Sequence, residues 1–331
     1  MTSPPVASSA VELLVLPPQS EMSTRWASRL AAELPELEVT VAADETQACK
    51  ALQGGVRAAF GTLTPLLLEA ARDLAWLQAP MAAPPEGYFF PELAAHPVVV
   101  TNLRGTYTDH VATHAVALLL ALARNLPYYA HQQASGTWAP DKRPETILHL
   151  QESTVLIVGV GAIGAYLARL LAPLGCRVVA TDARLEEVPE GVTELRRPGD
   201  LDELLPHADA VVLTVPHTPE TFRLFDAARF AKMKPSALFV NIGRGAVVDL
   251  DALTAALTDD VIRAAAVDVV PEEPLPSDHP LWFHPRAIVT PHVAAVGPHS
   301  DDRRFAVLRE NAERFLHGRP LLNVVDKAAW F

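Results

Sequence analysis

A glycine fingerprint near the middle of the chain constrains its fold more than any other feature. An apolar run at residues 154–158 is followed by residues 159–164, which read Gly-Val-Gly-Ala-Ile-Gly, and then by an amphipathic stretch. This order predicts a strand, a tight turn and a helix. Gly159 permits the turn, Gly161 lets backbone approach a pyrophosphate, and Gly164 lets the helix pack close to the strand. The N–H groups at the start of that helix favour phosphate, so we expect a dinucleotide site here.

A second apolar run, residues 176–181, follows the helix and ends in Asp182. Gly175, just before it, suits a helix C-terminal cap. A carboxylate at this position bonds the ribose hydroxyls of adenosine and repels a 2′-phosphate, which favours NAD (NADH) and makes NADP the less favoured cofactor. Arg184 lies nearby in the sequence and could soften the preference, and a purely structural Asp182 is the alternative reading.

Composition limits the function classes. A chain of 331 residues suggests about two domains, and a formal net charge of −12 argues against a nucleic-acid partner. Two cysteines are too few for a disulfide framework. The longest apolar run, residues 115–123, is far short of a membrane span of about 20 residues. The N-terminal residues contain no basic region typical of a signal peptide, so we expect a cytoplasmic protein with no membrane partner.

Strand and helix patterns alternate along the whole chain. The predicted strands are residues 11–16, 56–60, 74–78 and 98–101 before the fingerprint, and 155–158, 177–181, 210–215, 237–242, 264–269 and 287–290 from the fingerprint onward. Further helices are predicted at residues 24–34 and 301–316. Helical segments between most of the later strands favour a parallel, doubly wound sheet, in which ligands bind at the carboxyl ends of the strands.

A long helix is expected between the two sets of strands. It begins near Asp109, a plausible N-cap, and runs to about Asn125 before Pro127. It is apolar around most of its circumference, so it must be buried. Packing between domains or between subunits is one reading, and an internal core helix is the other.

Three side chains at predicted strand ends form a coherent chemical set. Arg244 can grip a carboxylate through two parallel hydrogen bonds. His292 can donate or take a proton near neutral pH, and Glu273 can fix its ring. Beside a nicotinamide, this set suits hydride transfer coupled to proton transfer at a 2-oxo or 2-hydroxy carbon.

With these residues in place, the chain resembles the D-isomer-specific 2-hydroxyacid dehydrogenases. The resemblance extends from about Leu74 to Pro320 and is strongest over residues 154–297. The motifs that carry it are the fingerprint, Val215-Pro216-His217-Thr218-Pro219-Glu220-Thr221, Asn241 to Gly245, Asp268-Val269, Glu273-Pro274-Leu275-Pro276 and Thr290-Pro291-His292-Val293-Ala294-Ala295.

The resemblance implies a role for each matched residue. Arg244 would bind the substrate carboxylate and carbonyl, Glu273 would orient His292, and His292 would be the general acid in reduction. Asp268 would hold the nicotinamide carboxamide. The expected cofactor-binding residues are Gly159, Gly161, Ala162, Ile163, Gly164, Asp182, Val215, Pro216, Thr221, Ile242, Gly243, Asp268, His292 and Ala294, and no metal site is expected.

Two rivals remain open, and the first part of the chain departs from the family pattern. Glu272 competes with Glu273, and His217 competes with His292 although it more readily lines the cofactor pocket. The loop around Ala83 would hold the substrate carboxylate through backbone N–H groups, but two prolines there lack that donor. Arg104 is a second candidate for anion contact, with a hinge salt bridge as its alternative.

A second departure lies at the start of the long helix. Residues 112–114 read Ala-Thr-His, where the family commonly has an Ala-Glu pair.

The expected fold is α/β, with two doubly wound parallel-sheet domains. A Rossmann NAD-binding domain at 103–297 is inserted into a flavodoxin-like substrate domain made of 1–102 and 298–331. The expected protein is a homodimeric NAD-dependent oxidoreductase that interconverts a small-molecule 2-oxo acid and a D-2-hydroxy acid. The alternative is an NAD(H)-sensing regulator on the same fold. Formate oxidation is disfavoured because that subgroup has Gln where Glu273 stands.

Overall fold

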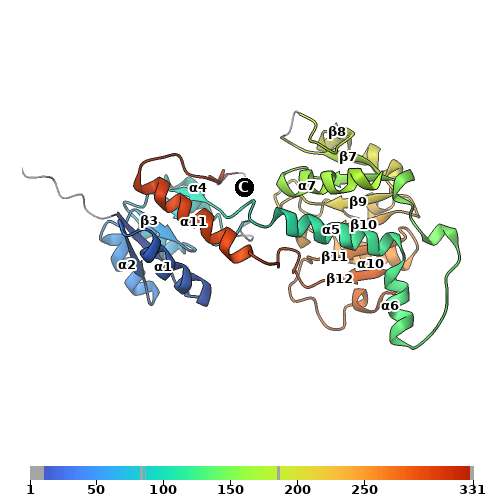
Figure 1. The fold of residues 1–331 in the computed structure, drawn as a ribbon, viewed down its shortest axis with the longest axis horizontal. Helices are drawn as coiled ribbons and strands as arrows, with labels where there is room; N and C mark the ends of the chain where they lie inside the picture. Colours follow the sequence, from blue (N-terminus) through green and yellow to red (C-terminus); the bar gives the residue numbers. More distant parts are fainter. Residues whose placement is uncertain (1–10, 83–84, 86, 185–186, 329–331) are drawn as a thin grey trace, which may run out of the picture. The chain divides into compact units, whose positions relative to one another are not determined.

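Contacts divide the chain into two compact units. One consists of the residues up to Thr106 together with those from Pro298 onward, and the other is Tyr107–Gly297. The sequence suggested the divisions at 102/103 and 297/298. The computed structural model describes residues 11–82, 85, 87–184 and 187–328. In Figure 1 the first unit carries both the blue and the red ends of the colour range, because the chain leaves it and later returns.

The first unit is built around a five-stranded parallel sheet. Its strand order, β2-β1-β3-β4-β5, is that of a flavodoxin-like sheet, which is the fold expected for this domain. The strands are β1 (Val11–Val15), β2 (Leu37–Val41), β3 (Ala58–Phe60), β4 (Trp76–Gln78) and β5 (Val99–Thr101). The helices are α1 (Glu21–Glu33), α2 (Glu45–Gln53), α3 (Pro65–Ala70), α4 (Pro91–Ala95) and α11 (Ser300–Leu316). The hydrophobic cluster under α2, α3 and α4 covers one face of the sheet.

A buried polar network ties the returning C-terminal segment to this sheet. The side-chain oxygen Oε1 of Gln78 accepts from the Thr101 hydroxyl at 2.8 Å and from Asn311 Nδ2 at 3.0 Å. Asn311 also exchanges two hydrogen bonds with the backbone of Leu322. Because all these buried polar groups have partners, residues more than two hundred positions apart complete one core.

The second unit is built around a seven-stranded parallel sheet. Its order, β12-β11-β10-β9-β6-β7-β8, is that of a Rossmann sheet with one extra strand. The strands are β6 (Thr154–Val158), β7 (Arg177–Thr181), β8 (Glu194–Arg196), β9 (Ala210–Leu213), β10 (Leu238–Asn241), β11 (Ala264–Val267) and β12 (Ala287–Val289). The helices are α5 (Thr108–Ala123), α6 (Leu126–Ala134), α7 (Ala162–Leu171), α8 (Leu201–Leu204), α9 (Ala227–Phe230) and α10 (Leu250–Thr258).

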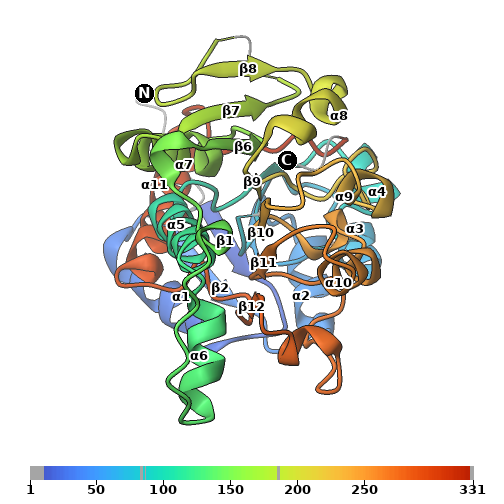
Figure 2. The same cartoon turned by 90° about the vertical axis from the view of Figure 1, so that its right-hand side faces the viewer.

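Helices cover both faces of this sheet, and the two faces have separate cores. Figure 2 shows α5 and α7 on one side of the strands and α8, α9 and α10 on the other. The central strands are buried on both faces and consist almost wholly of aliphatic residues. Such runs are typical of a parallel sheet between helical layers. Single-turn 3₁₀ segments complete this unit: Pro144–Thr146, Leu150–Glu152, Ala172–Leu174, Pro198–Asp200, Leu205–His207, Gly245–Val247 and Pro280–Phe283.

Helix α5 is part of the core of its own unit. Its side chains at Val111, Ala115, Leu119 and Leu122 are buried among strand and α7 residues. The predicted N-cap at Asp109 is wrong: the N-cap is Tyr107, and Asp109 lies in the first turn. An acidic residue fits either place, because both lie near the positive end of the helix dipole.

Short or polar segments account for what the sequence patterns missed. Strand β2 and helix α2 received no prediction, nor did β8, a three-residue edge strand whose side chains are all half-buried. Helix α7 begins at Ala162, three residues before the amphipathic stretch that the sequence predicts from Ala165 to Leu174, because Gly161 is its N-cap. Several strands end one or two residues before their apolar runs end, because the chain is already turning toward the site there.

Candidate active site

The predicted functional residues gather at the carboxyl end of the seven-stranded sheet. In parallel sheets this edge holds ligands, because the loops and helix N-termini converge there. The residues that follow β6, β7, β9, β10, β11 and β12 at or near this edge are Gly159, Asp182, Val215, Ile242, Asp268 and His292.

The glycine turn has the shape that a dinucleotide requires. Gly159 has φ +92°, and a Cβ there would lie 2.6 Å from Val215 Cγ1. A Cβ at Gly164 would overlap the carbonyl oxygen of Gly159, so only glycine lets α7 pack this closely. A Cβ at Gly161 would meet nothing within 4 Å, which leaves open space above the helix N-terminus. The first-turn amides of α7, including those of Ala162 and Ile163, point to that end of the helix.

Asp182 is attached to this turn. Its Oδ2 accepts from the Val160 N–H at 2.9 Å and its Oδ1 from the Arg184 N–H at 2.9 Å. An ionised carboxylate has about four acceptor sites, so it can accept several hydrogen bonds at once.

The segment after β9 lies between the fingerprint and the Arg244 loop. Thr221 donates its hydroxyl to the Pro216 carbonyl at 2.7 Å and accepts the Thr218 N–H at 2.7 Å. A Cβ at Gly243 would lie 2.6 Å from the Val215 carbonyl oxygen. The two predicted loops are therefore packed directly against each other.

Arg244 lies in a short loop after β10 that internal hydrogen bonds hold in place. The buried Asn241 side chain donates to the Arg244 carbonyl at 3.1 Å and accepts from the Gly243 N–H at 3.1 Å. The guanidinium donates to the Gly243 carbonyl at 2.6 Å. Burial lowers the pKa of Arg244, while Tyr107 and Glu273 act in the opposite direction. Arginine stays protonated in proteins, so the loop presents a fixed positive charge.

Glu273 and His292 form a directly bonded pair. His292 Nδ1 lies 2.7 Å from Glu273 Oε2, and Glu273 Oε1 accepts from the Val270 N–H at 3.2 Å. The side chains are 50% and 39% exposed, so Nε2 of the imidazole can meet a ligand. The carboxylate that contacts His292 is Glu273, not its rival Glu272. Gly245 brings the Arg244 loop against the same segment, because a Cβ there would overlap the Val270 carbonyl group.

Asp268 lies beneath the turn that carries His292. Its side chain is 1% exposed and accepts the Thr290 hydroxyl at 2.6 Å and the N–H groups of Val293 and Ala294 at 2.9 Å each. This carboxylate therefore secures the turn that carries His292. Ala294, a predicted cofactor contact, is buried beneath that turn.

Comparisons with known proteins agree with this geometry. The family profile described as D-isomer specific 2-hydroxyacid dehydrogenase, NAD binding domain, matches residues 116–294. Glyoxylate/hydroxypyruvate reductase B of Citrobacter koseri is 37% identical over 236 residues, which cover 71% of this chain and 72% of that protein. The chain belongs to the D-isomer specific 2-hydroxyacid dehydrogenase family.

Solved structures extend the likeness to both units. A D-isomer specific 2-hydroxyacid dehydrogenase from Xanthobacter autotrophicus, in complex with NADPH and MES, is 28% identical with a TM-score of 0.83, and the match covers 98% of this chain and 100% of that one. An NADPH-dependent glyoxylate/hydroxypyruvate reductase from Sinorhizobium meliloti, in complex with NADP and sulfate, is 28% identical with a TM-score of 0.79, covering 97% and 99%. Membership in this dehydrogenase family places the chain among NAD(P)-dependent oxidoreductases of 2-oxo and 2-hydroxy acids, and the regulatory alternative is not favoured.

The remaining predicted residues have other surroundings. Arg104 is exposed and reaches the Val324 carbonyl at 3.5 Å, within the first unit. Ala83 lies outside the described residues. His217 belongs to the segment after β9, where its ring packs against Phe222 with 5.7 Å between centroids. Tyr107, which lies close enough to Arg244 to affect its pKa, was not predicted and could be found only once α5 was placed against the β10 loop.

Substitution of Gly161 separates cofactor binding from folding. Gly161→Ala is expected to leave the thermal midpoint nearly unchanged and to weaken NADH binding about tenfold or more, because its methyl group enters the open space where a pyrophosphate fits. Thermal unfolding and NADH fluorescence titration measure the two effects.

Gly159→Ala is the matched control. It should lower stability by about 1–3 kcal/mol, because it strains a positive φ and crowds Val215. Wild-type NADH affinity in Gly161→Ala would contradict a pyrophosphate site in the open space at Gly161.

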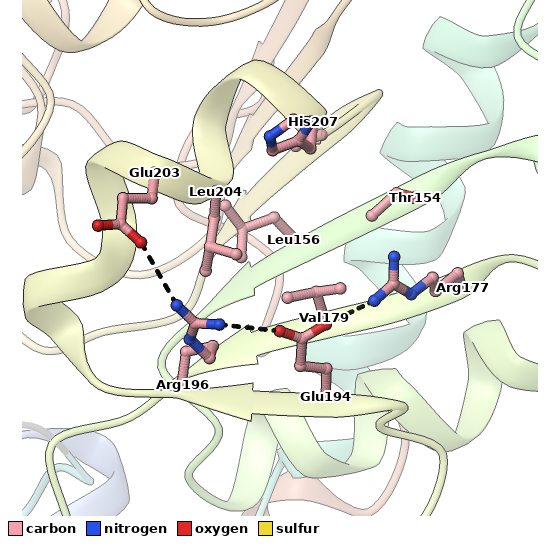
Figure 3. A pocket seen from close by; sticks show the side chains of 10 residues that line it. Thr154, Leu156, Arg177, Val179, Glu194, Arg196, Glu203, Leu204 and His207 are labelled. Atoms are coloured by element: carbon pink, nitrogen blue, oxygen red, sulfur yellow. Dashed lines mark hydrogen bonds and ion pairs between the residues drawn. The ribbon is translucent and has the colours of Figure 1, made fainter.

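A cavity of about 280 Å³ lies elsewhere in this unit. It is bordered by the first residues of β6 and β7 and by residues of β8 and the α8 region, as Figure 3 shows. Its charged groups pair with one another: Arg177 and Arg196 both contact Glu194, and Arg196 also reaches Glu203. None of the predicted site residues lines it, so we assign it no part in the chemistry.

Two features of the described residues concern metal binding and the membrane. No cluster of three or more histidine, cysteine, aspartate or glutamate side chains could hold a metal ion there. No single helix in that part of the chain is long and apolar enough to cross a membrane, although α5 and α6, bent by 74° relative to each other, have the length and composition of a span when taken as a pair.

Proposed function

We propose that the protein reduces a small 2-oxo acid to a D-2-hydroxy acid, with Arg244, Glu273 and His292 as its catalytic residues. The observation that carries the proposal is the convergence of a fixed guanidinium and a bonded Glu–His pair at the edge that also holds the glycine turn. Each of these groups also occurs by itself in proteins as a purely structural feature. Together they match the carboxylate, the carbonyl and the proton of one reaction.

In this mechanism Arg244 binds the substrate carboxylate and polarises the adjacent carbonyl oxygen. The cofactor, when bound, supplies a hydride to substrate C2. His292 carries a proton on Nε2 and delivers it to the carbonyl oxygen, which becomes the hydroxyl. Glu273 holds Nδ1–H and stabilises the positive charge of the imidazolium before the proton leaves.

A substrate panel tests the activity. Several relatives are named glyoxylate or hydroxypyruvate reductases, so glyoxylate and hydroxypyruvate head a panel that also contains pyruvate and larger 2-oxo acids. We expect oxidation of NADH with at least one of them, followed by absorbance. Failure of every member with both NADH and NADPH would overturn the proposal.

We propose NADH as the preferred cofactor and NADPH as a weaker one. Asp182 faces the fingerprint turn, and a 2′-phosphate would meet its negative charge. Two cations near Asp182 reduce this repulsion. Arg184 follows Asp182 closely, and Arg197 donates to the Ala183 carbonyl at 3.4 Å. Two structural relatives hold NADPH or NADP, so the balance between these charges decides the preference.

Replacing the carboxylate tests this balance. Asp182→Ser is expected to move the ratio of kcat/KM values for NADPH and NADH about tenfold or more toward NADPH, because the ribose hydroxyls lose an acceptor and a 2′-phosphate loses a repulsive charge. Glu190→Gln removes an exposed carboxylate from the same β7–β8 connection and should leave the ratio unchanged. An unaltered ratio in Asp182→Ser would show that another group sets the preference.

We also propose that the protein acts as a homodimer. Helix α6 and the segment after it form an arm that extends away from the sheet (Figure 2) and is braced by its own contacts, from Tyr128 to the Ala139 carbonyl and from Tyr129 to the Asp141 carbonyl. Trp138 on this arm is 97% exposed. A segment that is held by its own hydrogen bonds and exposes a tryptophan side chain fits an interface with a second copy of the chain, since tryptophan is enriched at interface centres.

Removing the indole tests the dimer. Trp138→Ser should raise the dimer dissociation constant roughly thirtyfold or more, since truncating such an anchor costs about 2 kcal/mol or more. Light scattering across a dilution series measures it, and Val188→Ser, another exposed apolar residue of the same unit, is the control. A monomeric wild-type protein at micromolar concentration would reject the proposal.

A further inference from the structure

The turn that carries His292 has an unfavourable backbone conformation. His292 has φ +53°, in the left-handed region that side chains other than glycine and asparagine adopt at a cost. Its N–H donates to the Asp268 carbonyl at 2.8 Å. The next two N–H groups donate to the Asp268 carboxylate. The aim of the His292 ring at Glu273 therefore depends on where this buried carboxylate lies.

A third element holds the same carboxylate. His114 of α5 places Nε2 3.1 Å from the Thr290 hydroxyl and 3.6 Å from Asp268 Oδ1. The Thr290 hydroxyl has one proton, and its 2.6 Å contact with Asp268 Oδ1 takes it, because the carboxylate can only accept. His114 must then donate Nε2–H to the Thr290 oxygen. This direction fixes the tautomer of His114 and the rotation of the hydroxyl.

We infer that His114 is a positioning residue for the reaction, acting on His292 through Thr290 and Asp268. The inference rests on the proposed function for its kinetic consequence. Donation by His114 satisfies the Thr290 oxygen and keeps its proton on Asp268. The carboxylate then stays where it receives the two N–H groups that stabilise the left-handed turn. Without that donor, the Thr290 hydroxyl can rotate away from Asp268. The left-handed turn then loses part of the hydrogen bonding that offsets the cost of its backbone conformation.

A histidine that only fills space in the core makes a different prediction. His114 is partly exposed, at 24%, and lies in the second turn of α5 beside the buried residues of that helix. If it only packed, any side chain of similar size would replace it. If it positions the turn, only a side chain with a donor at the place of Nε2 will do.

Three substitutions separate these cases. Glutamine places its amide nitrogen close to the position of Nε2, asparagine places it near Nδ1 and too short to reach Thr290, and leucine has a similar volume without a donor. We expect His114→Leu and His114→Asn to lower kcat for the best 2-oxo acid about tenfold, with KM for NADH unchanged. His114→Gln should retain at least about half of the wild-type kcat. The control is Thr113→Ala, an exposed neighbour on α5.

A spectroscopic measurement does not depend on activity. In histidine-¹⁵N spectra of the protein alone, His114 should show the Nε2–H tautomer. The His292 ring signals, assigned from their loss in His292→Asn, should move in His114→Leu and remain in place in His114→Gln and Thr113→Ala. If the substrate panel shows no activity, the proposed function fails while these spectra still decide the role of His114.

The inference would be overturned by an Nδ1–H tautomer at His114, by unmoved His292 signals in His114→Leu, or by wild-type kcat in that variant. Equal losses in His114→Gln and His114→Leu would also overturn it, because they would point to packing alone.

Discussion

His292→Asn is expected to lower kcat for 2-oxo acid reduction by about 10²–10⁴, the usual contribution of a positioned general acid. Asparagine is chosen because it tolerates the left-handed backbone at this position and can keep a hydrogen bond to Glu273 from the place of Nδ1. The variant should therefore fold like the wild type and keep most of its affinity for NADH. Only the proton on Nε2 is lost, so steady-state kinetics should show the loss mainly in kcat.

Two other histidines complete this test. His207 is exposed and is not one of the predicted site residues, so His207→Gln should have the kcat and KM values of the wild type. His217→Gln should change KM for NADH more than kcat, because that residue lies in the segment after β9. A large loss of kcat in His217→Gln together with a small one in His292→Asn would reverse our assignment of the acid.

Arg244→Gln is expected to lower kcat/KM for the 2-oxo acid by about 10²–10³. Truncating one member of a hydrogen-bonded charge pair costs about 2–5 kcal/mol, and a tenfold change corresponds to about 1.4 kcal/mol. Arg244→Lys should recover part of the loss, because it retains the positive charge without the planar fork that matches a carboxylate. Kinetics with glyoxylate or the best substrate of the panel measure both variants.

The control for this charge is Arg169→Gln, since Arg169 is an exposed cation on α7 that lies over the Tyr166 ring. Binding of NADH should be similar in all three variants. If Arg244→Gln kept the wild-type KM and kcat, the substrate carboxylate would have to be held elsewhere. The loop around Ala83 would then be the next segment to test.

Sequence patterns predicted the two parallel sheets because buried parallel strands consist of aliphatic runs that few other structures require. They also predicted that Arg244, Glu273 and His292 would meet. The reason is geometric: the carboxyl ends of parallel strands share one edge, so residues that follow β10, β11 and β12 become neighbours. Strands β2 and β8 were missed because partly exposed edge strands carry little apolar periodicity.

The choice between neighbouring candidates was more difficult to make from sequence. Glu272 and Glu273 have almost the same sequence context, and only backbone geometry shows that Glu273 reaches His292. For Asp268, the strand-end position suggests a ligand contact, and only the structure shows that this carboxylate also secures a turn.

The sequence by itself determined the sheet types, the glycine cradle and the chemical set, because each is encoded locally by residue type and spacing. Only the tertiary structure decided how that set is held in place. His114, Asp268 and Thr290 lie on three elements separated by long stretches of chain, and their hydrogen bonds exist only after α5 packs against β11 and β12. Hydrogen bonds act over about 3 Å, whereas sequence periodicity places elements far less finely than that. Such partnerships therefore become visible only when the chain has folded.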